Sequence, residues 1–242
     1  MVELVGRSAI SLRTARWCGA AALLATALFS GSVAHARPSL DGAGLTELAR
    51  YEVLTFGDAY RDGIDSGKAI GVVDATPEEV FRVATDFERY KDFMPRIAAS
   101  TQLSRTSDSA EVVIAAELPW PAGRRWIEAD YRFERPSRDI YRIRFDMVRG
   151  NMRQYLGSLY IEPFTKTQTA ITYELIAEPD LVAPKSIINK GVRRTVGKFV
   201  HALRQRINDL HQLGLLHPVL PPVRLAETAV VRPDPATLKA RR

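Results

Sequence analysis

The spacing of apolar positions along the chain changes once, and this change predicts its elements. Six stretches are strand candidates, and in several of them apolar and polar residues alternate with a period of two: 98–106, 110–118, 125–135, 139–148, 151–162 and 167–177. Such alternation is typical of strands with one buried face, and the short links between them predict an antiparallel meander. From Pro184 the apolar residues recur at helical spacing, which predicts an amphipathic helix of about seven turns that ends at Gly214.

A further strand and two short helices are predicted before the meander. Residues 68–74 are rich in β-formers, Thr76 then offers an N-cap, and Pro77 suits the first helical position. A second short helix is expected over 89–94, and it ends at a proline. This order of elements predicts an α+β domain. Its seven-stranded sheet packs its apolar face onto the apolar stripe of the long helix.

The start of the chain resembles an export signal. Residues 1–36 combine a basic beginning, an uncharged apolar run and small residues at Ala34 and Ala36, which is the layout of a secretory signal peptide. The apolar run is shorter than the ~20 residues that a membrane-spanning helix needs. We therefore expect cleavage after Ala36 and export, to the periplasm of a Gram-negative cell and otherwise to the outside.

The mature chain would then have three parts. Residues 37–66 are a lead-in segment, residues 67–214 the domain, and residues 215–242, with five prolines, a flexible tail. Cleavage would remove the only cysteine, Cys18, and lower the formal net charge from +6 to +4 by removing three arginines and one glutamate. A mild positive charge on an exported protein favours transient contact with an anionic membrane surface. Nucleic acid is not expected as a partner, because no motif for it is present.

Three stretches carry a resemblance to a known family. They are DATPEEVFRVATDFERYKDFMPRI, then LPWPAGRRW at 118–126, and lastly RQYLGSLYIEP followed by TAITYEL. These resemble the opening segment, a Pro-Trp-Pro loop and the last two strands of the START-like helix-grip superfamily, also called the polyketide cyclase/dehydrase and coenzyme Q-binding group. The resemblance implies a curved seven-stranded antiparallel sheet wrapped around a long C-terminal helix.

The side chains that face this helix form the candidate ligand site. A sheet that curls around one helix tends to leave a cavity, and such cavities bind ligands. We expect a hydrophobic small molecule there, such as a lipid, quinone, sterol or polyketide-like compound, and a role as carrier or sequestering protein. Alternatively, the same side chains only pack against each other. The candidate lining residues are Tyr131, Phe133, Tyr141, Phe145, Met147, Tyr155, Tyr173, Phe199 and Leu203.

The loop at 118–126 is a second candidate site. Trp120 and Trp126 would form an amphipathic rim of the cavity, while Arg124 and Arg125 would meet phosphate head groups at a membrane. Alternatively, the two indole rings plug the end of the core. Two glycines within the long helix, at 191 and 197, indicate either close packing or space left for a ligand.

No catalytic signature, metal site or cofactor site is expected. The sequence has no Gly-x-Ser-x-Gly elbow, and its mature histidines lack metal-ligand spacing and are expected on the surface: His201, His211 and His217. Glu128, Asp130 and Glu174 fall opposite the apolar stripe, so they are expected to face solvent. An inward carboxylate would favour a polyketide cyclase/dehydrase-type enzyme instead. A protein-interaction module with a filled core is a further alternative.

Overall fold

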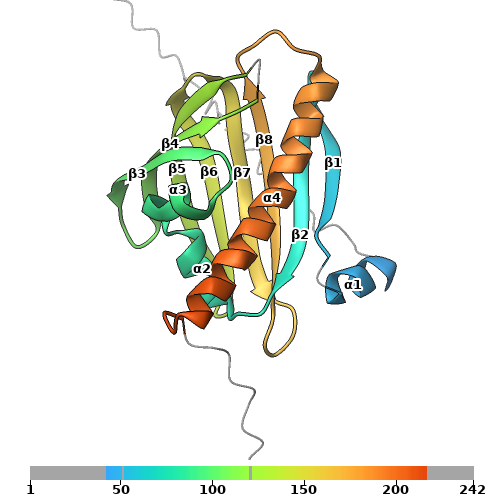
Figure 1. Ribbon diagram of the computed structural model, residues 1–242, viewed down its shortest axis with the longest axis vertical. Helices are drawn as coiled ribbons and strands as arrows, with labels where there is room; N and C mark the ends of the chain where they lie inside the picture. Colours follow the sequence, from blue (N-terminus) through green and yellow to red (C-terminus); the bar gives the residue numbers. More distant parts are fainter. Residues whose placement is uncertain (1–41, 51, 120–121, 217–242) are drawn as a thin grey trace, which may run out of the picture. The chain divides into compact units, whose positions relative to one another are not determined.

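The computed structural model describes residues 42–50, 52–119 and 122–216 (Figure 1). The signal peptide expected at 1–36, Trp120 and the tail from residue 217 lie outside the described residues. None of the described helices is both long and apolar enough to cross a membrane. The elements, in chain order, are α1 (Gly42–Ala49), β1 (Leu54–Arg61), β2 (Ile64–Val73), α2 (Pro77–Ala84), the 3-10 turn η1 (Phe87–Arg89), α3 (Tyr90–Phe93), β3 (Ile97–Arg105), β4 (Ser109–Glu117), β5 (Arg124–Ser137), β6 (Ile140–Gly150), β7 (Met152–Pro163), β8 (Thr169–Pro179) and α4 (Lys185–Gln212).

The strands form one antiparallel sheet with α4 lying across one face (Figure 1). The spatial order is β1-β2-β8-β7-β6-β5-β4-β3, so the predicted meander from β3 to β8 is present and β2 closes onto the last strand. We call the face that α4 covers the inner face and the opposite one the outer face. The fold is the helix-grip arrangement that the sequence predicts.

The sheet has eight strands, which corrects the predicted seven. The additional strand is β1, which pairs with β2 at the sheet edge. It lies in the predicted lead-in segment, where the sequence offers a strand candidate only over 51–56. Seven of its eight residues are exposed, and a strand without a buried face shows no apolar alternation. Asp62 and Gly63 form the two-residue loop between β1 and β2, both with positive φ. An Asp-Gly pair is a strong sequence signal for such a hairpin.

Two glycines of β2 allow α4 to approach closely. A Cβ atom at Gly67 would lie 2.8 Å from Val192 Cγ1, and one at Gly71 would lie 2.6 Å from Val200 Cγ1. Side chains at these two positions would push the helix away, so the absence of a Cβ atom sets the distance between helix and sheet.

The glycines of α4 itself have different surroundings. A Cβ atom at Gly197 would lie 3.1 Å from Thr55 Cγ2 in β1, whereas one at Gly191 would meet open space. Gly197 therefore allows close packing, which is one of the two predicted explanations. At Gly191 no close contact with the described residues requires a glycine.

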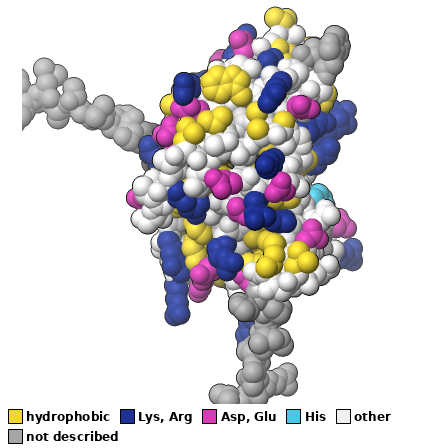
Figure 2. All heavy atoms as spheres, turned by 60° about the vertical axis from the view of Figure 1, so that its left-hand side comes forward, with side chains coloured by type: hydrophobic (Ala, Val, Ile, Leu, Met, Phe, Trp, Pro, Cys, Tyr) yellow, Lys and Arg dark blue, Asp and Glu magenta, His cyan; other side chains and the backbone are white. Residues whose placement is uncertain are grey.

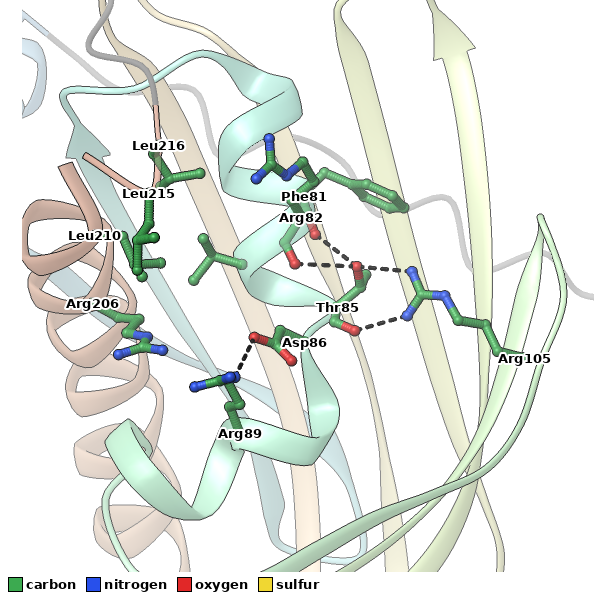
Figure 3. A pocket seen from close by; sticks show the side chains of 11 residues that line it. Phe81, Arg82, Thr85, Asp86, Arg89, Arg105, Arg206, Leu210, Leu215 and Leu216 are labelled. Atoms are coloured by element: carbon green, nitrogen blue, oxygen red, sulfur yellow. Dashed lines mark hydrogen bonds and ion pairs between the residues drawn. The ribbon is translucent and has the colours of Figure 1, made fainter. Parts of the chain in front are cut away.

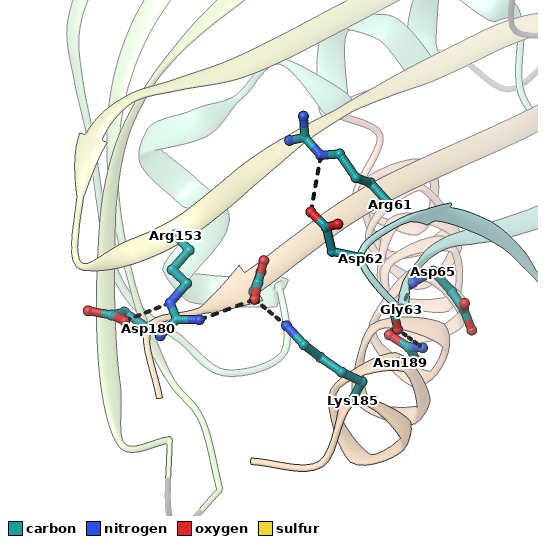
Figure 4. Close-up of polar contacts among 9 residues, drawn as sticks. Arg61, Asp62, Gly63, Asp65, Arg153, Asp180, Lys185 and Asn189 are labelled. Carbon is teal, nitrogen blue, oxygen red and sulfur yellow. Dashed lines mark hydrogen bonds and ion pairs between the residues drawn. The ribbon is translucent and has the colours of Figure 1, made fainter. Parts of the chain in front are cut away.

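Polar contacts fix the first turns of α4 to the sheet (Figure 4). Asn189 donates a hydrogen bond from Nδ2 to the carbonyl oxygen of Gly63, and its Oδ1 accepts one from the backbone N–H of Asp65, both at 3.1 Å. Lys185, the first helical residue, donates a hydrogen bond to Glu178 in β8 at 2.5 Å. The amino-terminal end of α4 is thus held by both neighbouring strands.

The N-cap predicted at Thr76 is present, and together with Glu79 it forms a capping box at the start of α2. Thr76 Oγ1 accepts a hydrogen bond from the backbone N–H of Glu79, and Glu79 Oε2 accepts one from the backbone N–H of Thr76 at 2.8 Å. The other carboxylate oxygen of Glu79 lies 3.4 Å from His211 Nε2 in the last turn of α4. His211 is therefore partly buried between two helices, which corrects its predicted place on the surface. Its partner lies 132 residues away in the chain, so no local pattern indicates the contact.

The surface mixes charges of both signs. On the face shown in Figure 2, lysine and arginine side chains lie beside acidic ones, with apolar patches between them. On the outer face, α1 packs Leu48 against Ile70 and Val72 of β2, which forms a small second hydrophobic cluster.

Candidate ligand site and an arginine-lined hollow

The predicted ligand residues gather in the core between the inner face and α4. They come from β5, β6, β7, β8 and α4, and all belong to the main hydrophobic cluster or pack against it. Their placement on one face follows from the alternation in the sequence, while ligand binding by them stays a prediction. Five are buried and four are partly buried: Tyr131, Tyr141, Phe145, Tyr173 and Leu203, and then Phe133, Met147, Tyr155 and Phe199.

Aromatic rings run in a continuous line through this core. Phe199 of α4 stacks on Tyr173 with ring centroids 4.0 Å apart, and Tyr173 lies 6.1 Å from Phe145. Phe145 also contacts Tyr155 at 5.2 Å and Tyr131 at 5.4 Å. Aromatic pairs attract each other at such separations. Phe145 is therefore the centre of a cluster of rings that connects β5, β6, β7 and β8 with the helix.

Three tyrosine hydroxyls supply the polar groups of this cluster. Tyr155 shares side-chain hydrogen bonds with both Tyr131 and Tyr173. Burial raises the pKa of all three phenols above the usual value for tyrosine, because the phenolate would lose its hydration. They stay protonated at neutral pH and can therefore donate hydrogen bonds.

A hollow of about 470 Å³ lies between α2, η1, the end of β3 and the last turns of α4 (Figure 3). Its volume falls within the range of small-molecule sites in proteins. One wall is apolar and comes from Leu210, Leu215 and Leu216, and Phe81 of α2 also lines the space. The charged residues around it are Arg82, Asp86, Arg89, Arg105 and Arg206.

Two of the four arginines are held by neighbours. Arg105 donates hydrogen bonds to the carbonyl oxygen of Thr85 at 2.8 Å and to its Oγ1 at 3.1 Å. Arg89 forms an ion pair with Asp86 at 3.7 Å. Because the oxygens that bind Arg105 are neutral, only one arginine of the hollow is neutralised by an acid.

The other two arginines have no hydrogen-bonding or ion-pair partner for their side chains within the described part of the chain. Arg82 projects from α2 at the edge of the hollow. The guanidinium of Arg206 lies 5.6 Å from the centre of the Phe93 ring, and its buried Nε has no partner. A buried N–H donor without a partner is costly, since it has lost its hydrogen bonds to water.

Phe81 connects the hollow with the predicted ligand residues. Its ring stacks on Tyr141 at 4.7 Å and meets Phe133 edge-on at 5.6 Å. The hollow and the aromatic core are therefore separated by no more than this layer of rings at that point.

The loop at 118–126 is described only in part, because Trp120 lies outside the described residues. Trp126 is 40% exposed and belongs to neither hydrophobic cluster, so its ring does not plug the core. Arg124 is exposed, and Arg125 donates a hydrogen bond to the carbonyl oxygen of Asp180 at 3.4 Å. Membrane contact by this loop stays a prediction.

The candidate acids lie on the outer face, but not all face solvent. Glu128 is only 5% exposed, because Arg149 covers its carboxylate with an ion pair of 2.6 Å. The hydrogen bond from Arg149 lowers the pKa of Glu128 below its usual value. Glu174 is partly buried beside Lys68 at 3.9 Å, while Asp130 is exposed as expected. The prediction of solvent exposure is thus wrong for Glu128, since long cationic side chains lie across this face.

The arginines of the hollow were not predicted as site residues. Arg206 is one of several basic residues of the long helix, which by themselves indicate either a solvated face or a face that contacts anionic lipid. It follows Leu203 by three positions and precedes Leu210 by four, and helical spacing places such residues beside each other. This spacing is the signal that could have placed Arg206 at the border of the apolar stripe.

Comparison with known families identifies the chain. The family model for polyketide cyclase / dehydrase and lipid transport matches residues 73–204, which is more than half of the sequence. The chain belongs to this family. The segment matched by the polyketide cyclase/dehydrase and lipid transport family holds all nine predicted ligand residues and ends two residues before Arg206. The comparison with curated proteins found no match.

Solved structures with the same fold include members from bacteria and humans. A STAR-related lipid transfer protein from Xanthomonas axonopodis has a TM-score of 0.59 and 18% identity, and the match covers 64% of this chain and 93% of that one. Human STARD10 has a TM-score of 0.57 and 16% identity, with 67% and 73% covered. The Zhui aromatase/cyclase from Streptomyces sp. R1128 has a TM-score of 0.52 and 11% identity, with 60% and 94% covered. At these identities the likeness shows the fold alone.

Proposed function

We propose that this family member binds a hydrophobic small molecule between the inner face and α4, and acts as its carrier or sequestering protein. A lipid, quinone, sterol or polyketide-like compound suits the chemistry of the predicted lining. The observation that carries the proposal is the aromatic cluster around Phe145. Four strands and the helix contribute its rings, and the tyrosine hydroxyls are its polar groups. Burial of apolar ligand surface, at about 25 cal/mol per Å², would drive binding.

The proposed place of action is outside the cytoplasm, next to a membrane. The signal-peptide layout of residues 1–36 supports export, and the formal charge of the mature chain supports contact with anionic lipid. The lipid transfer protein from Xanthomonas axonopodis has the same fold, which is consistent with a lipid cargo.

Native mass spectrometry of the mature protein, purified gently from its own cell envelope, tests this function. Extraction of the bound material would identify its class. We expect one molecule of a hydrophobic compound bound to each protein molecule. A protein that arrives empty, and that takes up no quinone, fatty acid or sterol when these are supplied, would overturn the carrier function.

Two matched tyrosine variants locate the ligand. Tyr155→Phe removes the hydroxyl that binds Tyr131 and Tyr173, whereas Tyr160→Phe removes one from the outer face of the same strand. We expect the first change to weaken binding of a ligand with a polar oxygen about threefold to tenfold, as loss of one neutral hydrogen bond does. The second should leave affinity unchanged. If the two variants change the affinity equally, the ligand does not bind at the inner face.

A second function is supported by the same hydroxyls. An enzyme of the cyclase or dehydrase type needs a buried group that donates a proton or hydrogen bond, and the three phenols are buried and protonated. The fold shared with the Zhui aromatase/cyclase is consistent with this alternative. Turnover of an aromatic polyketide precursor that Tyr155→Phe abolishes, without loss of precursor binding, would establish the enzyme.

A further inference from the structure

We infer that the hollow between α2, η1 and the end of α4 binds the negatively charged head group of a single-chain amphiphile, such as a fatty acid. This inference rests on the proposed function, because it narrows the class of hydrophobic ligand to an anionic one. It uses residues outside the predicted ligand set, and four of them lie beyond the segment that the family model matches: Arg206, Leu210, Leu215 and Leu216.

The charge around the hollow points to an anion. Four arginines and one aspartate give it a net charge of +3, and the arginine that is paired uses the only acid there. Guanidinium groups bind carboxylate and phosphate oxygens through paired N–H donors, with stronger hydrogen bonds than neutral groups form. An anion in the hollow would therefore find several donors within a small volume.

Arg206 is the residue best placed to meet the head group. Its Nε is buried without a partner, and its guanidinium lies against the face of Phe93, which favours a cation at 5.6 Å. The aromatic contact restricts the guanidinium before any ligand arrives. Because this guanidinium has no hydrogen-bond or ion-pair partner among the described residues, a ligand carboxylate would supply an acceptor for its remaining N–H groups.

The apolar wall distinguishes an amphiphile from a simple anion. Leu210, Leu215 and Leu216 line the side of the hollow formed by the end of α4, and Leu215 is 63% exposed. Phosphate or acetate would leave Leu215 in water, whereas an alkyl chain would cover it. Phe81 also lines the hollow and packs on Tyr141 and Phe133, so the alkyl chain would lie against the apolar layer that borders the core.

A series of ligands with one chain length tests the head-group preference. Dodecanoate, dodecanol and dodecyltrimethylammonium share an alkyl chain and differ in charge, and each is titrated into the full-length protein below its micelle concentration by calorimetry. We expect dodecanoate to bind about tenfold more tightly than dodecanol, which corresponds to one charge-assisted hydrogen-bonded contact, and the cation to bind less than either.

Two arginine variants on the same helix assign the preference. Arg206→Gln removes a charge from the hollow, and Arg194→Gln removes an exposed charge three turns earlier in α4. We expect Arg206→Gln to abolish the tenfold preference for dodecanoate over dodecanol, and Arg194→Gln to retain it. Thermal unfolding of both variants controls for loss of the fold.

The outcomes separate this inference from the proposed function. If dodecanol and dodecanoate bind equally, the head-group site is wrong while hydrophobic binding stands. If only dodecanoate binds and Arg206→Gln removes that binding, the head-group site stands and binding of neutral ligands between sheet and helix is wrong. If neither binds, the head-group site is overturned, and the proposed function is overturned with it when quinone and sterol also fail to bind. If inorganic phosphate displaces dodecanoate at equal concentration, the hollow is a simple anion site and the amphiphile is excluded.

Discussion

The distance between α4 and the sheet can be tested at a single glycine. In Gly67→Ala the new Cβ atom would lie 2.8 Å from Val192 Cγ1 and 3.1 Å from the carbonyl carbon of Val192. Carbon atoms pack best at about 3.5–4.0 Å, so α4 must move outward by several tenths of an ångström. Such overpacking costs about 1–3 kcal/mol, and the lower entropy of the unfolded alanine chain returns about 0.4–1 kcal/mol. We therefore expect a net loss of about 1–2 kcal/mol in the free energy of unfolding.

Urea unfolding, followed by circular dichroism, measures this loss. Gly191→Ala is the matched control, because a Cβ atom there meets open space and alanine in a helix interior is favoured over glycine by about 1 kcal/mol. The two alanine variants should thus move the midpoint in opposite directions at an unchanged slope. A Gly67→Ala protein as stable as the wild type would show that α4 does not contact β2 at this position, and would refute the packing described above.

Three further changes have defined outcomes. Thr76→Ala should cost about 1 kcal/mol in urea unfolding through loss of the N-cap of α2, while Thr76→Ser should restore most of it. Asn189→Ala should cost about 1–3 kcal/mol, because it leaves two backbone groups of the β1–β2 hairpin without partners; Asn189→Asp, which keeps only the acceptor, should fall between. Arg149→Gln should lower the thermal midpoint at neutral pH, because the hydrogen bond from Arg149 lowers the pKa of Glu128 and so stabilises the fold above the unfolded pKa. The difference from the wild type should shrink as the pH falls through the folded pKa. A difference that persists in acid would show that Arg149 acts by packing instead.

Sequence periodicity predicted the fold because most elements have one buried face. The alternation in β5 to β8 and the apolar stripe of α4 both arise from packing against a single core, so each stretch could be interpreted alone. Periodicity did not predict strand β1, because an exposed edge strand has no buried face and therefore no apolar alternation. The sequence signal for this strand is the turn at Asp62 and Gly63 that follows it. The capping residue Thr76 was predictable for the opposite reason, since its partner is only three residues away.

The candidate sites were predictable only where one face of one strand decides them. The inner face of the sheet follows from alternation, so the aromatic residues around Phe145 were placed correctly relative to the core. The hollow requires α2, β3 and α4 to meet, and its arginines look like ordinary solvated residues within their own segments. The contact between His211 and Glu79 could not be predicted for the same reason. Such groupings depend on the angles between elements, which local spacing does not contain.

The pairing of β2 with β8 has a consequence for how the chain folds. It joins Gly67 to Leu175 and Val73 to Thr169, so the ladder closes a segment of about a hundred residues. Closing a flexible loop of this length costs about 4 kcal/mol of chain entropy before any contact is gained. We expect folding to be slow and limited by this closure, with the local β3–β8 hairpins forming first. The core cannot be completed until α4, which follows the last strand, has been synthesised, so the nascent chain stays open until then, which would suit the export proposed above.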